Sequence, residues 1–193
     1  MTRRPSGGAN AGHQYAVRSS VRHYQGDIFE VLSDDVAMPG GVTATREYTR
    51  HLGAVGVVAL DEADRVVLVR QYRHPVGRYL WELPAGLVDL AGEAPQACAV
   101  RELAEEADLR AAHWEPLIEI FTSPGHSDEY MRIFLARDLS PVPEPDRHRR
   151  EHEEAELTVA RFDLGRAVDM IFEGEIVNGP CATGLLAARC RRP

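Results

Sequence analysis

Two neighbouring stretches, Gly86-Leu-Val-Asp-Leu-Ala-Gly-Glu93 and Arg101-Glu-Leu-Ala-Glu-Glu106, decide how this sequence is interpreted. The second stretch lies in the segment 95–107, which favours a helix because its proline stands in the first turn, where proline is tolerated. On that helix Glu102, Glu105 and Glu106 share one face, at positions i, i+3 and i+4. Like charges at this spacing destabilise a helix by about 0.2–0.5 kcal/mol per pair, so the cluster indicates a compensating cation.

A Glu-x-x-Glu-Glu pattern alone is also typical of a solvated acidic helix face. Three neighbouring features favour a metal site instead. Arg101 can pair with an adjacent carboxylate, Glu93 supplies a fourth acid, and the turn Leu83-Pro-Ala-Gly86 can turn backbone oxygens towards a metal. Oxygen ligands of this kind suit Mg²⁺ or Mn²⁺.

The composition is that of one globular domain. The chain has 193 residues, 44% hydrophobic and 27% charged, which excludes a wholly disordered chain and a collagen-like fibre. No apolar run approaches the roughly 20 residues that a membrane-spanning helix needs. The 22 basic and 30 acidic residues give a net charge of −8, which is unfavourable for nucleic-acid binding. We therefore expect neither a nucleic acid nor a membrane as partner.

The basic residues and the cysteines exclude further classes. All 22 basic residues are arginine, which excludes a lysine Schiff base and a Walker-type phosphate loop. The three cysteines lack zinc-finger spacing, and their odd number favours a reduced, cytoplasmic location.

The pattern along the chain predicts an α/β or α+β fold with a mixed sheet and a few helices. The segment 1–14 is expected to be a disordered tail, and 34–41 a turn region. Strands or extended pieces are expected at 24–32, 43–50, 53–60, 65–72, 81–84, 115–122, 130–135 and 157–162, and helices at 95–107, 164–173 and 180–190.

The two stretches together resemble the Nudix box, G-x5-E-x7-R-E-U-x-E-E-x-G-U, in which U is a bulky apolar residue. Glu93, the run 101–106 and Leu109 fit this pattern. Two features depart from it, because six residues instead of five separate Gly86 from Glu93, and Asp108 replaces the last glycine. The extra residue precedes the helix, and aspartate tolerates a left-handed helix end better than most residues. We therefore expect the metal ligands to be undisturbed.

Other segments are similar to the ADP-ribose pyrophosphatase branch of the Nudix family, and most closely to its actinobacterial members. They are Gln71-Tyr-Arg-His74, Trp81-Glu-Leu-Pro-Ala-Gly86, Ser123-Pro-Gly125, Ser127-Asp-Glu129 and Glu173-Gly-Glu-Ile-Val-Asn178. The resemblance implies a Nudix α/β/α sandwich with an N-terminal strand extension, in which 53–193 is the catalytic domain. It implies that 15–52 exchanges strands in a homodimer. It also implies Mg²⁺-dependent (or Mn²⁺-dependent) hydrolysis of ADP-ribose to AMP and ribose 5-phosphate.

The resemblance also assigns roles to individual residues. The metal ligands it implies are Glu102, Glu106 and the backbone oxygen of Ala85, with Glu105 and Glu156 as further acids at the metal. The general base is expected at Glu154, with Glu153 as its competitor and Glu105 as the next candidate. The substrate contacts it implies are Arg46, Phe29, Arg73, Glu82 and Glu129. Glu93 and Arg101 are expected to form an ion pair that orients the ligands, beside Gly86.

Two other functions stay open at this stage. The first is hydrolysis of another nucleoside diphosphate sugar, such as GDP-mannose. The second is a non-catalytic sensor that binds ADP-ribose and regulates a partner. Sensors of this fold usually have damaged boxes, whereas the carboxylates of this box are all present. The sequence therefore favours the enzyme.

Overall fold

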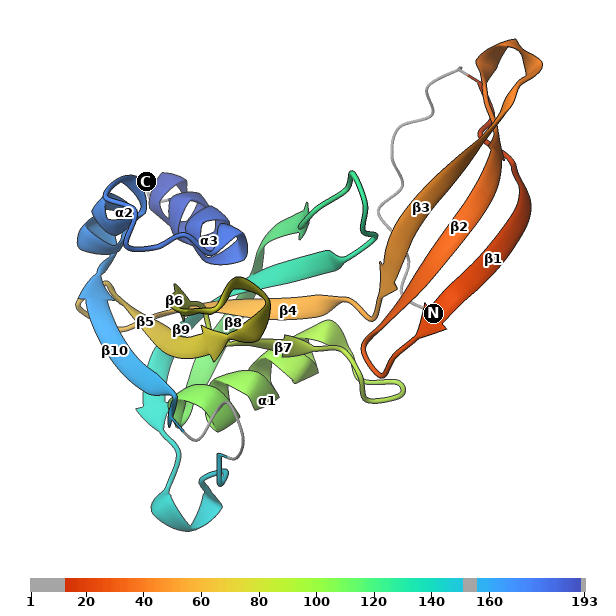
Figure 1. Cartoon of the computed structure of the whole chain (residues 1–193). Coiled ribbons are helices and arrows are strands. Elements are labelled where there is room, and N and C mark those ends of the chain that lie inside the picture. The colour runs from red at the N-terminus through yellow and green to blue at the C-terminus, as the bar shows by residue number, and fades with distance from the viewer. Residues whose placement is uncertain (1–12, 151–155, 192–193) are drawn as a thin grey trace. The chain divides into compact units, whose positions relative to one another are not determined.

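The computed structural model describes residues 13–150 and 156–191, and the chain divides into two compact units, 1–50 and 51–193. The first unit is a three-stranded sheet of β1 (Val17–Gln25), β2 (Phe29–Ala37) and β3 (Thr43–His51), in that order (Figure 1). The chain reverses between β1 and β2, so the single strand expected at 24–32 is wrong. The turn expected at 34–41 is right only in its second half, since β2 runs to Ala37 and a 3-10 turn follows at Pro39–Gly41. All of β1 is exposed, and its sequence therefore lacks the alternation that marks a half-buried strand.

The second unit is built on a mixed sheet of seven strands. They are β4 (Ala54–Leu60), β5 (Arg65–Arg73), β6 (Arg78–Glu82), β7 (Ala85–Leu87), β8 (Leu109–Phe121), β9 (Tyr130–Pro141) and β10 (Thr158–Asp163). The order is β10-β5-β4-β9-β8, with β6 beside β5 and β7 beside β4. Strands β4 and β9 are parallel, whereas β8 and β9 are antiparallel.

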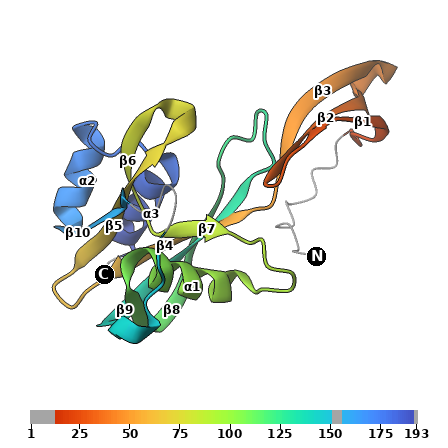
Figure 2. The same cartoon turned by 60° about the horizontal axis from the view of Figure 1, so that its bottom comes forward.

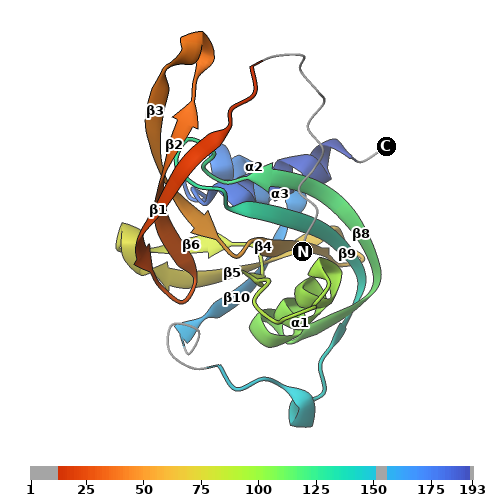
Figure 3. The same ribbon diagram turned by 90° about the vertical axis from the view of Figure 1, so that its right-hand side faces the viewer.

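In the described part of the chain, three α-helices cover the two faces of this sheet. They are α1 (Pro95–Ala107), α2 (Leu164–Phe172) and α3 (Gly179–Cys190). Helix α1 lies on one face, and α2 and α3 lie together on the other (Figure 1). The long strands β8 and β9 curve past α1 (Figure 3). This arrangement confirms the expected α/β/α sandwich with an N-terminal strand extension.

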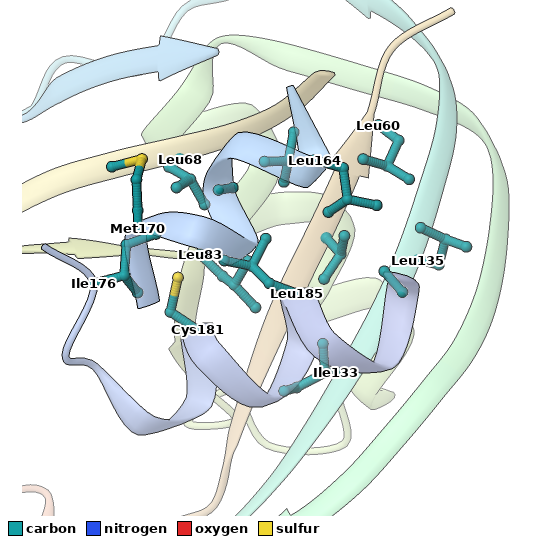
Figure 4. Close-up of a cluster of buried hydrophobic side chains, with 14 of the residues drawn as sticks. Leu60, Leu68, Leu83, Ile133, Leu135, Leu164, Met170, Ile176, Cys181 and Leu185 are labelled. Carbon is teal, nitrogen blue, oxygen red and sulfur yellow. The ribbon is translucent and has the colours of Figure 1, made fainter. Parts of the chain in front are cut away.

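Strand β4 divides the core between the two faces. Successive side chains of a strand point to opposite sides, and Val55, Val57 and Ala59 pack with α1, whereas alternate residues pack with α2 and α3. Figure 4 shows the second cluster, in which leucines of the sheet meet α2 and α3. All seven residues of β4 are buried, so the central strand is fixed from both sides.

The predicted helices agree with the structure to within one residue at each end. The long pair β8 and β9 extends beyond the ranges expected for it, because much of β8 is exposed and carries no clear alternation. None of the described helices is long and apolar enough to cross a membrane.

Candidate active site

Helix α1 ends in the way that its box requires, although the box glycine is missing. Asp108 follows the last helical residue in a left-handed conformation, with φ 54° and ψ 35°, and its N–H donates to the carbonyl oxygen of Leu103. Glycine usually occupies such a position, and aspartate is among the few other residues that tolerate it. The extra residue between Gly86 and Glu93 lies before α1, which begins at Pro95.

Two acidic side chains of α1 are buried against the backbone of β7. Glu102 and Glu106 are only 8% and 3% exposed. Oε2 of Glu106 accepts a hydrogen bond of 2.8 Å from the N–H of Ala85. A Cβ on Gly86 would lie 2.1 Å from the carboxylate of Glu102, so a larger residue here would have to displace that carboxylate. Figure 2 shows β7 alongside α1. Two carboxylates one helical turn apart therefore face the same short strand.

Arg101 holds three carboxylates with one guanidinium group. Its Nε and Nη2 donate to the two oxygens of Glu93 at 3.2 and 3.1 Å. Its Nη1 donates to Glu102 at 2.6 Å and to Glu105 at 3.2 Å. The hydrogen bond from Arg101 lowers the pKa of Glu93, and the same bond raises the pKa of Arg101. Asp89, which the sequence analysis did not single out, lies 3.6 Å from Nη2.

The residues present have the chemistry that fits a divalent cation, and Arg101 bonds two of them. Among the residues that the structure describes, no three His, Cys, Asp or Glu side chains are grouped to hold a metal. Arg101 bonds both Glu102 and Glu105, so these acids face the guanidinium. The buried carboxylates of Glu102 and Glu106 are hard oxygen donors, which Mg²⁺ and Mn²⁺ prefer. These acids also have partners within the chain, since Arg101 bonds Glu102 and the N–H of Ala85 bonds Glu106.

Glu82, at the end of β6, is a third buried acid beside the site. Arg73 on β5 donates from Nε to both carboxylate oxygens, at 3.0 and 3.1 Å, and from Nη2 at 2.6 Å. Gln71 adds a longer contact of 3.5 Å. The structure thus joins two residues expected to contact the substrate, and 46% of the Arg73 side chain stays exposed.

Two further predicted residues lie on loops around the site. Glu129 accepts a hydrogen bond from the hydroxyl of Thr122, and its N–H donates to Oγ of Ser127 at 3.1 Å. Glu156 accepts a bond of 2.9 Å from the hydroxyl of Tyr79, which raises the pKa of that tyrosine. The partners Thr122 and Tyr79 were missed by the sequence analysis. Each lies one or two residues outside a segment quoted for the resemblance, and its contact joins residues that are apart in the sequence.

The remaining predicted residues lie in the first unit or outside the described residues. Phe29 lies on β2 and Arg46 on β3, both in the first unit. Arg46 donates to the carbonyl oxygen of Thr45 at 2.9 Å. The two candidates for the general base, Glu153 and Glu154, lie outside the described residues. The roles expected for these four residues stay predictions.

Comparison with known proteins gives consistent relatives. A family model described as the NUDIX domain matches residues 50–173. The chain is 45% identical to the ADP-ribose pyrophosphatase of Mycobacterium tuberculosis, over 92% of this chain and 84% of that protein. It is 33% identical to the ADP-ribose pyrophosphatase of Bacillus subtilis, over 82% and 84% respectively. A crystal structure of an ADP compounds hydrolase has the same fold, with a TM-score of 0.78 over 94% of this chain and 95% of that one, at 22% identity.

We expect Gly86→Ala to displace the Glu102 carboxylate and to destabilise the protein by about 1–3 kcal/mol, the usual effect of overpacking. The added Cβ would overlap the carboxylate at 2.1 Å. Thermal unfolding of the purified variant measures this. The matched control is Gly179→Ala, because a Cβ there meets nothing within 4 Å. Equal unfolding midpoints for the two variants would contradict the close approach of Glu102 to β7.

Proposed function

This chain belongs to the Nudix family of hydrolases, and from that premise we propose that it cleaves the pyrophosphate of ADP-ribose to give AMP and ribose 5-phosphate. The observation that carries the proposal is the pair of buried carboxylates, Glu102 and Glu106, against the backbone of β7. The two relatives named above, both called ADP-ribose pyrophosphatases, support the substrate.

Nudix hydrolases typically depend on a divalent metal, and we propose that Glu102, Glu106 and the backbone oxygen of Ala85 hold it here, assisted by Glu105 and Glu156. A divalent cation bound there supplies positive charge to the pyrophosphate oxygens and lowers the pKa of water bound to it. Arg101 stays paired with Glu93 and fixes the direction of the Glu102 carboxylate, as outer partners of metal ligands do.

The chain's own residues then perform the hydrolysis. Arg73 presents the exposed part of its guanidinium to a phosphate, while Glu82 keeps the group in place. Glu154 accepts the proton of the attacking water. The water oxygen forms a bond to phosphorus as the bond between that phosphorus and the bridging oxygen breaks. Glu129 contacts the terminal ribose, and Arg46 and Phe29 approach the adenine.

We further propose a homodimer in which the first unit exchanges strands with its partner. Three apolar side chains of β1, Val17, Val21 and Tyr24, are each more than half exposed. Grouped exposed apolar side chains are typical of protein interfaces. The buried thiols of Cys98 and Cys181 are free, which supports a cytoplasmic location.

The function is tested by a substrate panel with Mg²⁺, in which chromatography resolves nucleoside monophosphate and sugar phosphate. We expect ADP-ribose to be hydrolysed faster than GDP-mannose. EDTA should abolish the activity, because the pyrophosphate charge then stays unneutralised, and Mg²⁺ or Mn²⁺ should restore it. Faster hydrolysis of GDP-mannose would reassign the substrate, and full activity in EDTA would refute the metal site. Binding of ADP-ribose without turnover would favour the sensor.

Glu106→Gln should lower kcat by about 10²–10⁴-fold, the rate equivalent of several kcal/mol of lost metal assistance. The substitution keeps the size of the side chain, so the fold should survive, and Mg²⁺ should no longer raise the unfolding midpoint. The matched control is Glu115→Gln, since Glu115 is exposed on β8. Wild-type rates in Glu106→Gln would contradict the metal site and show that the cluster is only an acidic helix face.

Glu154→Gln should lower kcat by about 10²–10⁴-fold with little change in KM, as expected when a general base is lost. Glu153→Gln, its neighbour in the same acidic run, serves as the control and should be mild. Steady-state kinetics with ADP-ribose decides between them. The opposite ranking would assign the base to Glu153, and two mild effects would make Glu105 the candidate.

The dimer is tested by multi-angle light scattering at micromolar concentration, where we expect twice the chain mass. Arg46→Ala should raise KM for ADP-ribose, because Arg46 of one chain is proposed to lie beside the adenine bound to the other. A monomer with intact activity would refute the composite site.

A further inference from the structure

Asp108 accepts hydrogen bonds from both ends of one neighbouring segment, Val142–Arg150. The N–H of Val142 donates to the carbonyl oxygen of Asp108 at 2.8 Å. At the other end of the segment Val142–Arg150, Nη2 of Arg150 donates to Oδ2 of Asp108 at 2.6 Å, and Nε donates to the carbonyl oxygen of Glu105 at 3.0 Å. The side chains of Arg150 and Asp108 are only 21% and 26% exposed, so the ion pair is largely shielded from water.

The segment that Asp108 closes has hydrogen bonds of its own. The N–H of Asp146 donates to the carbonyl oxygen of Pro143 at 2.9 Å. Nε of Arg147 reaches back to the carbonyl oxygen of Val142 at 3.2 Å. These hydrogen bonds hold the segment together. Arg150 connects it to the end of α1.

The charges at the end of α1 explain why an arginine is needed there. The last carbonyl groups of a helix lack partners within the helix, and the end carries partial negative charge. Asp108 adds a full negative charge at this end, within three residues of Glu105 and Glu106. Arg150 offsets that charge and satisfies a last-turn carbonyl. A glycine at position 108, as the Nudix box has, would give the turn but no carboxylate for Arg150 to bind.

We propose that Arg150 is a positioning residue of this hydrolase. Acting through Asp108 and the carbonyl group of Glu105, it fixes the last turn of α1, and with it the carboxylates of Glu105 and Glu106, against the segment Val142–Arg150. Arg150 also directly precedes the acidic run that begins at Glu151. The aspartate that replaces the box glycine thus gains a role that glycine cannot fill. This inference rests on the proposed function, because it takes Glu106 as a metal ligand.

The kinetic test uses Arg150→Gln, Asp108→Gly and the double variant. Each single substitution should lower kcat for ADP-ribose about tenfold, because small displacements of catalytic groups strongly lower the rate of the chemical step. KM should change little. Asp108→Gly keeps the left-handed turn and is expected to fold. If the two residues act through each other, the double variant should be no slower than the slower single variant. Losses that multiply in the double variant would overturn the proposal.

A second readout does not depend on activity. Hydrogen–deuterium exchange of peptides covering 103–108 and 142–150 should be faster in both single variants, because the last turn of α1 and the segment lose the bond between Arg150 and Asp108 that joins them. Arg150→Lys restores the charge and should recover part of kcat. The matched control is Arg110→Gln, which breaks the exposed ion pair of Arg110 with Asp146 in the same segment, and which should leave both kcat and exchange at position 108 unchanged.

The outcomes separate this inference from the proposed function. If the wild-type chain does not hydrolyse ADP-ribose, the proposed function fails. Hydrogen–deuterium exchange still tests whether the contacts of Arg150 with Asp108 and Glu105, called the clamp below, hold the end of α1. Faster exchange in Arg150→Gln with unchanged kcat would show a merely structural contact and overturn the positioning role. Unchanged exchange would overturn the clamp itself.

Discussion

The structure depends on the burial of two negative charges on one helix. Carboxylates are rarely buried unless they are paired or hold a cation, and Glu102 and Glu106 are buried on the same face of α1. Three neighbouring residues accommodate these carboxylates. Gly86 leaves room for one carboxylate, the N–H of Ala85 bonds the other, and Arg101 brings positive charge beside them. Hard oxygen donors placed together in this way are what a divalent cation prefers.

The same constraint explains why the site stands where it does in the sandwich. Strand β7 pairs with β4, the fully buried central strand, so the backbone that receives the two carboxylates is anchored to the core of the sheet. Beside the two acids, Ala99 and Leu103 of α1 pack into the core, and Sγ of Cys98 donates to the carbonyl oxygen of Leu87 in β7 at 3.2 Å. Apolar packing and this bond thus hold α1 against the sheet next to its acidic side chains.

The sequence predicted those parts of the fold that have a strong local pattern. Helix α1 was found at its observed bounds because Pro95 marks its start and the box marks its length. Strands β1 and β2 were misjudged because β1 is exposed throughout and β2 is almost uniformly half-buried, so neither shows an alternating burial pattern. The pairing of Arg73 with Glu82 and the clamp of Arg150 on Asp108 could not be found either. Both join residues whose proximity is set by the packing of strands and loops, and no local spacing reports it.

The two-sided burial of β4 also determines where this chain can change its length. A strand alternates its side chains between faces, so one residue inserted into β4 would exchange the residues that face α1 with those that face α2 and α3 beyond that point. Both cores would then have to repack at once. An insertion in the connection between β7 and α1 does not shift the residues of a central strand between the two cores. In that connection the chain carries one residue more than the Nudix box. Insertions and deletions in homologous chains should therefore collect in that connection and spare the central strand.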